Sequence, residues 1–184
     1  MAGFESTLSA IWASVGIGIV NVVFTVISLY LVDRIGRRKL YFIGLSGIAF
    51  SVLCLSACFI YANQLGEIGR WLMVIFMFGY VAFFAISIGP LGWLVISEIF
   101  PQKVRGLGTS IGSLAVWIFN CIVSFTFFKI IDFFSIPGTE IVVGQTTSEN
   151  PAGAFFLYGF IAVLGLVWGY LFLPETKGVI IGGD

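Results

Sequence analysis

Five long stretches without a charged residue constrain this chain more than any other feature of its sequence. They cover residues 6–32, 40–66, 71–97, 106–128 and 150–174. Each is long enough to cross the apolar core of a bilayer, which requires about 20 helical residues. Charged residues make up 10% of the chain, whereas a soluble domain carries about 25%. The sequence therefore predicts an all-α polytopic membrane protein with five transmembrane helices, at about 8–32, 40–63, 71–97, 106–131 and 153–173.

Basic residues in the connections predict the orientation of these helices, because Lys and Arg concentrate on the cytoplasmic side of a membrane. The turns after the first and third helices and the tail after the fifth contain seven Lys or Arg residues, whereas the opposite side contains two. We therefore expect an integral protein of the plasma membrane or the bacterial inner membrane. Its N-terminus would lie outside and its C-terminus in the cytoplasm.

The third apolar segment contains an interruption and then a charged end, in the sequence GPLGWLVISEIFPQKVRG at 89–106. Gly and Pro interrupt membrane helices only where neighbouring helices, a cavity or water satisfy the freed backbone groups. In transporters such interruptions mark the substrate site or a moving part. We expect the interruption to have one of these roles.

Two predicted helices carry polar residues on one face. Offsets of four and three residues place Asn21, Thr25 and Ser28 on one side of the first helix. The fourth helix has a similar stripe, formed by Ser113, Trp117, Asn120 and Ser124. Polar side chains that face lipid are costly, so each stripe faces either other helices, through hydrogen bonds, or a water-filled path.

Small residues predict close helix contacts. GxxxG spacing occurs at Gly108 and Gly112 and again at Gly165 and Gly169, and such spacing lets helices approach closely. The second helix is apolar apart from small residues and is predicted to serve packing. Residues 64–70 are expected to form a short external turn, and residues 132–152 a polar external loop.

Charged residues gather at the ends of the predicted helices, on the side with most basic residues. They are Asp33, Arg34, Arg37 and Arg38 in the first turn, Glu98 and Arg105 around the second, and Glu175 in the tail. Acids at helix ends beside basic turns favour ion pairs between neighbouring helices. A network of such pairs can open and close as a unit, which makes it a candidate gate. The alternative is that these charges only set topology.

Three motifs resemble signatures of the sugar porter family of the major facilitator superfamily, which includes facilitative glucose transporters and proton–sugar symporters. They are GxxNxxFTxxSLxLVDRxGRRxL at 18–40, GPLGWLVISEIFPQKVRG at 89–106 and PETKG at 174–178. The family fold has twelve helices in two halves, and the resemblance aligns the five predicted helices with the eighth to the twelfth. It implies a partial C-terminal half of such a fold, an incomplete C-terminal transmembrane bundle spanning 1–184. Its missing partners would be the N-terminal half and the seventh helix.

The resemblance also implies roles for individual residues in transport by alternating access. The implied sugar-binding residues are Asn21, Gly89, Pro90, Gly92, Trp93, Trp117 and Asn120. Such residue types suit a monosaccharide, because its hydroxyls need amide partners and its apolar faces lie on aromatic rings. The implied gating salt bridges, which stabilise the outward-facing state, involve Asp33, Arg34, Arg37, Arg38, Glu98, Arg105 and Glu175.

Departures from the family pattern leave other functions open. Val116 stands where family members often carry Asn or Gln, and Ala85 where some glucose transporters have Glu, so half of a non-sugar solute transporter is an alternative. A structural membrane subunit that pairs with another transporter half is a third. A membrane enzyme, a metal site or a cofactor is not expected, because the chain has no histidine and no nucleophile–base pair. Its net charge of zero argues against a nucleic-acid partner, and its expected partners are a monosaccharide and the lipid bilayer.

Overall fold

Apolar helices dominate the computed structural model, which describes residues 7–134, 141–143, 146–148 and 150–172. The elements in chain order are α1 Thr7–Ile35, α2 Arg37–Ile60, α3 Ala62–Ile86, α4 Ile88–Ile99, α5 Arg105–Phe134, β1 Ile141–Val143, β2 Thr146–Ser148 and α6 Ala152–Phe172. Within the described part, five spans are long and apolar enough to cross a membrane, and α3 and α4 together provide the third. The prediction of an all-α membrane fold with five transmembrane helices is confirmed.

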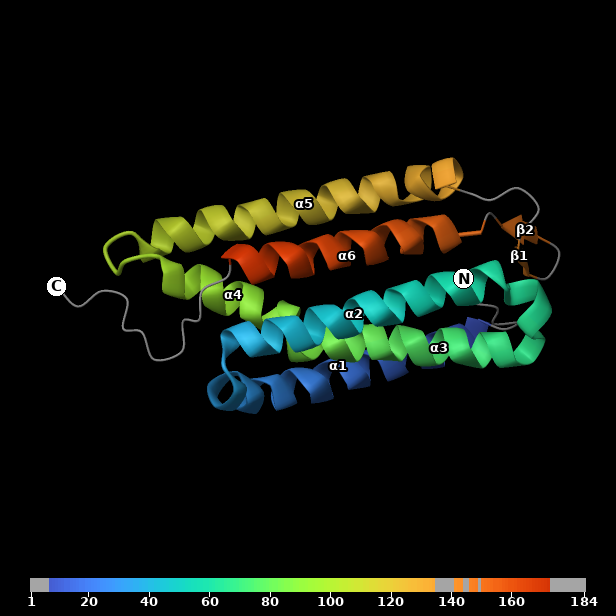
Figure 1. Ribbon diagram of the computed structural model, residues 1–184, viewed down its shortest axis with the longest axis horizontal. Helices are drawn as coiled ribbons and strands as arrows, with labels where there is room; N and C mark the ends of the chain where they lie inside the picture. Colours follow the sequence, from blue (N-terminus) through green and yellow to red (C-terminus); the bar gives the residue numbers. More distant parts are fainter. Residues whose placement is uncertain (1–6, 135–140, 144–145, 149, 173–184) are drawn as a thin grey trace.

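The five spans run side by side along the long axis of the molecule and alternate in direction, with α4 continuing the direction of α3 (Figure 1). The α1–α2 turn, the α4–α5 turn and the C-terminal end of α6 lie at one end, on the left of Figure 1. We call this the basic end, because Arg34, Arg37, Arg38 and Arg105 belong to it. The α2–α3 turn and the β-hairpin lie at the opposite end.

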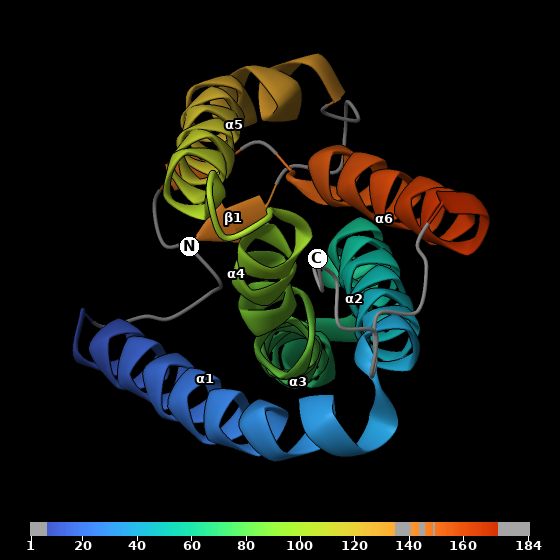
Figure 2. The same cartoon turned by 90° about the vertical axis from the view of Figure 1, so that its left-hand side faces the viewer.

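Helix α2 forms the centre of the packing. It packs most extensively against α3 and α6, and among the described residues it provides more buried residues than any other helix. Figure 2, viewed from the basic end, shows α2 beside α6, with α4 close to the middle of the bundle. The predicted packing role of the second helix is therefore confirmed.

Both GxxxG pairs lie in close helix contacts, as their spacing predicts. A Cβ atom on Gly108 would lie 2.3 Å from the ring of Phe100, and one on Gly112 would lie 2.8 Å from Ile96, so α5 packs closely on α4 at this point. A Cβ atom on Gly169 would lie 2.3 Å from the ring of Tyr41, on α2. Without side chains at these positions, the helix backbones approach closely.

The structure differs from the prediction in three segments. The third predicted helix is two helices, α3 and α4, separated at Ser87. Residues 64–70, predicted to form a turn, are helical except at Gly66, whose φ of 55° falls in the region that favours glycine. The loop at 132–152 contains the antiparallel hairpin of β1 and β2, in which Val142 pairs with Thr147. β-Branched residues fit such a pairing well.

Candidate functional site

The break between α3 and α4 is the most distinctive feature of the transmembrane part. Helix α3 ends at Ile86, Ser87 adopts a non-helical conformation with φ −124° and ψ −86°, and α4 starts at Ile88. In a continuous helix the residue at position 90 donates its N–H to the carbonyl of Ile86, four residues earlier, and Pro90 has no N–H. The break therefore starts ahead of the Gly89–Pro90 pair that signals it. Pro90 itself lies in the first turn of α4, where a missing N–H is tolerated.

Side-chain hydroxyls satisfy the carbonyls that the break frees. The Ser87 hydroxyl donates to the carbonyl of Phe83 at 2.8 Å. The Ser28 hydroxyl, on α1, donates to the carbonyl of Ile86 at 2.5 Å. Both serines are fully buried. The residues of the predicted polar stripe on the first helix therefore differ in their hydrogen bonds. Ser28 donates to a carbonyl of another helix, whereas Thr25 donates to the Asn21 carbonyl of its own helix.

Helix α4 contacts both α1 and α5, and this arrangement brings the three helices with predicted sugar-binding residues together. In Figure 2, α1 and α5 flank α4 on the side away from α2 and α6. Helices α4 and α5 are antiparallel, with Phe100 beside Gly108 and Ile96 beside Gly112. Continuing this register by one to two turns places Trp117 and Asn120 near the level of the first turn of α4.

The predicted sugar-binding residues with polar or aromatic side chains are exposed in this bundle. Trp93 of α4 is 48% exposed and Trp117 of α5 is 66% exposed. Asn21 of α1 and Asn120 of α5 are also exposed. The Asn120 amide donates to the carbonyl of Val116 at 3.0 Å, and a carboxamide has a second N–H and a carbonyl oxygen for other partners. These groups could hold a sugar against a further wall.

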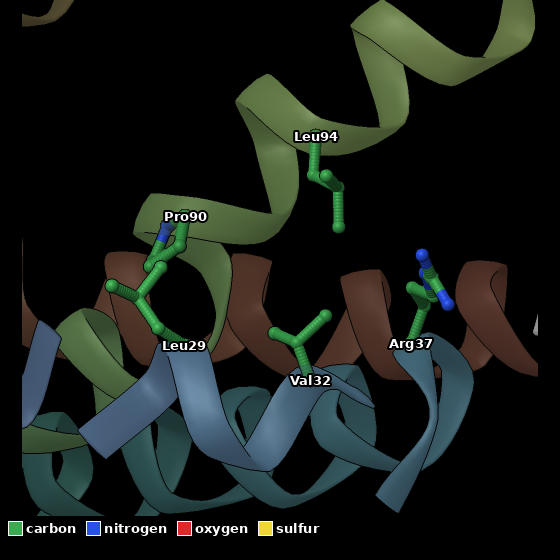
Figure 3. Close-up of a pocket in the computed structure, with 5 residues that line it drawn as sticks. All are labelled: Leu29, Val32, Arg37, Pro90 and Leu94. Atoms are coloured by element: carbon green, nitrogen blue, oxygen red, sulfur yellow. The ribbon is translucent and has the colours of Figure 1, made fainter. Parts of the chain in front are cut away.

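A cavity of about 180 Å³ lies beside the break, between α1, α4 and the start of α2. Its lining residues are Leu29, Val32, Arg37, Pro90 and Leu94 (Figure 3). Leu29 and Val32 face Pro90 and Leu94 across it, and Arg37 lies toward the basic end. A sugar needs several polar partners, and four of these five residues are apolar. Of the predicted sugar-binding residues only Pro90 lines this cavity, so it does not fit the predicted sugar site.

The structure describes the side chains of four of the seven predicted gating residues, and these four are arginines. The guanidinium group of Arg38 donates to the carbonyl of Tyr170 at 3.2 Å, in the last turn of α6, where a cation is favourable. Arg105 has a long contact of 3.5 Å from its Nε to the carbonyl of Phe100. Arg34 is exposed and Arg37 is half-buried. Asp33 and Glu98 lie at the basic ends of α1 and α4, but their side chains, like all of Glu175, lie outside the described residues. The ion pairs stay a prediction.

Sequence reasoning missed several polar contacts between helices. The Tyr41 hydroxyl donates to the carbonyl of Gly165 at 2.9 Å, and the Ser56 hydroxyl donates to that of Ala152 at 2.7 Å. Asn150 caps α6 by accepting from the N–H of Ala152 at 3.0 Å, and its amide donates to the Phe59 carbonyl at 2.9 Å. An Asn–Pro pair directly before an apolar helix signals such a cap. The hydroxyl contacts across helices have no comparable sequence signal.

A sequence profile described as "Sugar (and other) transporter" matches residues 1–181 of the chain. The chain belongs to this family of sugar transporters. It is 33% identical over 173 residues to the D-xylose-proton symporter of Escherichia coli (strain K12), a match that covers 94% of the chain and 32% of the symporter. It is 32% identical over 181 residues to Probable polyol transporter 3 of Arabidopsis thaliana, covering 97% of the chain and 32% of that protein.

Solved structures of the major facilitator superfamily show the same arrangement of helices. The proton:xylose symporter XylE bound to 6-bromo-6-deoxy-D-glucose matches with a TM-score of 0.75 and 32% identity, over 94% of this chain and 34% of XylE. The inward open conformation of XylE from E. coli matches with a TM-score of 0.70 and 31% identity, over 93% and 34% of the two chains. This sugar transporter homologue is thus an integral membrane protein that spans about a third of the length of these relatives. The relatives are transporters, in agreement with the expectation that the chain is not an enzyme.

Proposed function

We propose that this chain forms the C-terminal cavity wall and the cytoplasmic gate of a sugar transporter that works by alternating access. The observation that carries the proposal is the helix broken between α3 and α4. Its second part, α4, is flanked by α1 and α5, and these three helices carry amide and indole side chains. Discontinuous membrane helices form substrate sites between the two halves of many transporters. A transporter of this kind needs two halves that rock about a central site, so these five helices act together with further helices.

The proposed substrate is a monosaccharide, held by Asn21, Trp93, Trp117 and Asn120. Indole rings cover the apolar faces of a sugar, and amides serve its hydroxyls as donor and acceptor. Relatives are named for D-xylose–proton symport and for polyol transport, so polyols form the second candidate class. Ala85 is 2% exposed and contributes only a methyl group, whereas Val116 is 36% exposed on α5. Neither Ala85 nor Val116 can form a hydrogen bond with a substrate hydroxyl through its side chain, whereas an amide or a carboxylate could. The site is therefore expected to bind fewer substrate hydroxyls than a site with polar residues at these two positions.

The proposed gate lies at the basic end, which faces the cytoplasm in the predicted orientation. The α1–α2 turn, the α4–α5 turn and the end of α6 lie there together, so their charged residues can form one network. Loss of Glu98 or Arg105 would shift the protein toward inward-facing states. The measurement is the accessibility of cysteine probes from the cytoplasmic side, which rises in the variants; equal accessibility in variants and parent contradicts the gate.

The transport proposal can be tested with a chimaera in which this chain replaces the matching third of the E. coli D-xylose-proton symporter. Proteoliposomes that contain the 184-residue chain alone are expected to take up no sugar, whereas the chimaera takes up labelled xylose, glucose or polyols. Asn120→Ala in the chimaera should raise the half-saturating concentration about tenfold, the equivalent of a lost hydrogen bond of about 1.4 kcal/mol.

Thr126→Ala is the matched control for Asn120→Ala. Thr126 lies on the same helix and is half-buried, and its hydroxyl donates to the Ile122 carbonyl of that helix at 2.7 Å. We expect this variant to transport like the unaltered chimaera. Uptake by the chain alone would contradict the need for further helices. A folded chimaera that moves organic anions but no sugar or polyol would contradict the substrate class.

A further inference from the structure

We propose that Ser28 is the positioning residue of the broken helix: its hydroxyl gives the Ile86 carbonyl the hydrogen bond that Pro90 cannot give. The two observations behind this are independent. Pro90 removes the N–H donor that lies four residues after Ile86 in a continuous helix. The Ser28 hydroxyl, from a different helix, donates to that same carbonyl at 2.5 Å.

Most of the described Ser and Thr hydroxyls bond within their own helix, whereas Ser28, like Ser56, donates to a carbonyl of another helix. A Ser or Thr in a membrane helix commonly donates to a carbonyl one turn earlier in its own helix. Thr25, Ser87, Thr109, Ser110, Ser113 and Thr126 do this, each to the carbonyl four residues back. Ser28 instead reaches a carbonyl 58 residues away in the sequence. The available acceptor at the break accounts for the difference.

Burial makes the hydrogen bond consequential. Ser28 and Ser87 are fully buried, so water does not reach the carbonyls at this point of the break. An unpaired carbonyl inside an apolar environment is costly, and neighbouring helices are the source of donors at breaks in membrane helices. Ser28 is therefore expected to set where α1 lies against the end of α3.

The same contact fixes two features of α1 that lie on either side of it, the wall of the apolar cavity and the proposed sugar-binding residue Asn21. One helical turn beyond Ser28, Val32 of α1 lines the cavity that Pro90 and Leu94 of α4 also line. Two turns before Ser28, α1 carries Asn21, which the proposed function assigns to sugar binding. Ser28 thus holds Asn21 at a defined depth relative to Trp93. This link to transport rests on the proposed function. The hydrogen bond from Ser28 to the Ile86 carbonyl, in place of the one that Pro90 cannot give, does not rest on it.

The test is a double-mutant cycle of Ser28→Ala and Pro90→Ala in the 184-residue chain, reconstituted in lipid nanodiscs. Spin labels at Ile75→Cys on α3 and Val104→Cys in the α4–α5 turn report the distance across the break; both sites are exposed. The native Cys54, Cys58 and Cys121 are replaced by alanine in all variants. Pulsed electron paramagnetic resonance gives the distance distribution, and detergent denaturation gives stability.

Ser28→Ala should shift or broaden the distance distribution and lower stability when Pro90 is present. It should have no further effect in the Pro90→Ala background, because the new N–H can donate to the Ile86 carbonyl. Thr25→Val is the matched control, since it removes a hydroxyl from the same helix whose bond stays within that helix. We expect it to leave the distance unchanged.

Two results would overturn the proposal. One is a Ser28→Ala variant with the parent distance distribution and stability. The other is an equal effect of Ser28→Ala with and without Pro90, which would show that Ser28 acts only through packing. If Ser28→Ala alone does not fold, the comparison of Pro90→Ala with the double variant still decides, because the proposal requires these two to be equal. None of these results depends on sugar transport, so they stand apart from the uptake test of the proposed function.

Discussion

The α2–α6 pair and the α3–α4 break show two different ways of joining membrane helices in one bundle. Between α2 and α6, contacts occur at both ends: Arg38 and Tyr41 donate to carbonyls of α6 near the basic end, and Asn150 and Ser56 form contacts at the opposite end. At the break, the Ser28 hydroxyl provides the described side-chain hydrogen bond from α1. Hydrogen bonds therefore join α2 and α6 at both ends of the pair, whereas the described side-chain bond joins α1 to the break at one place.

This difference indicates which part can move. Several hydrogen bonds spread over two helices resist both sliding and rotation of one helix against the other. A single side-chain hydrogen bond to α1, as seen among the described residues at the break, resists separation but permits rotation about it. We therefore expect α2 and α6 to behave as one body, and α4 to be the element whose position responds to substitution.

Substitution of Gly44 should have the largest effect, because this residue links the two regions. A Cβ atom on Gly44 of α2 would lie 1.5 Å from the Ser87 hydroxyl and 2.2 Å from the Ser87 Cβ. The Ser87 Cβ cannot rotate away, so the helix and the break must separate. Gly44→Ala is expected to lower the free energy of unfolding by about 3 kcal/mol, measured by detergent denaturation followed by circular dichroism.

Two glycine variants calibrate this result. Gly169→Ala would place its Cβ 2.3 Å from a ring atom of Tyr41, and that side chain can shift, so a smaller loss of about 1 kcal/mol is expected. Gly18→Ala has no atom within 4 Å of the new Cβ and should be neutral or slightly stabilising. If Gly169→Ala proved more damaging than Gly44→Ala, the break would be the more adaptable region.

Asn150→Ala should have the next largest effect, on the α2–α6 pair. It removes the N-cap of α6 and the hydrogen bond to Phe59, for a combined loss of about 2 kcal/mol. Asn150→Ser keeps an oxygen that can cap the helix but is too short to replace the amide donor, so it should recover about half. The measurement is the same denaturation experiment, and equal losses in the two variants would show that the cap contributes nothing.

Tyr41→Phe should have a smaller effect than Asn150→Ala. It removes only the hydroxyl that donates to the Gly165 carbonyl, and hydrogen bonds between membrane helices contribute about 0.6 kcal/mol on average. Because other contacts still tie α2 to α6, helix positions should not change. Cross-linking between cysteines introduced at α2 and α6 should therefore be the same in variant and parent. A lower yield would show that the pair depends on this one bond.

Much of the fold could be predicted because its cause is local in the sequence. A run of about 20 apolar residues must span the membrane as a helix, since lipid offers no partner for an exposed backbone. GxxxG spacing predicts a close contact, although the partner helix is not encoded in the spacing. The interrupted helix could be recognised from Gly89 and Pro90 alone.

The candidate site was only partly predictable because its contacts join distant parts of the chain. The sequence places Ser28 in a polar stripe with Thr25 but cannot separate their uses, which depend on where α3 ends. It places Pro90 at the break, whereas the structure also makes Pro90 a wall of an apolar cavity beside Arg37.

The sequence by itself determined that five apolar helices cross a membrane, that one of them is interrupted, and that its motifs are those of sugar transporters. Only the tertiary structure decided that the interruption starts at Ser87 and that a serine from α1 replaces the donor missing at Pro90. The physical reason is that a proline removes a hydrogen bond locally, but the group that replaces it must come from whichever helix packs beside the break.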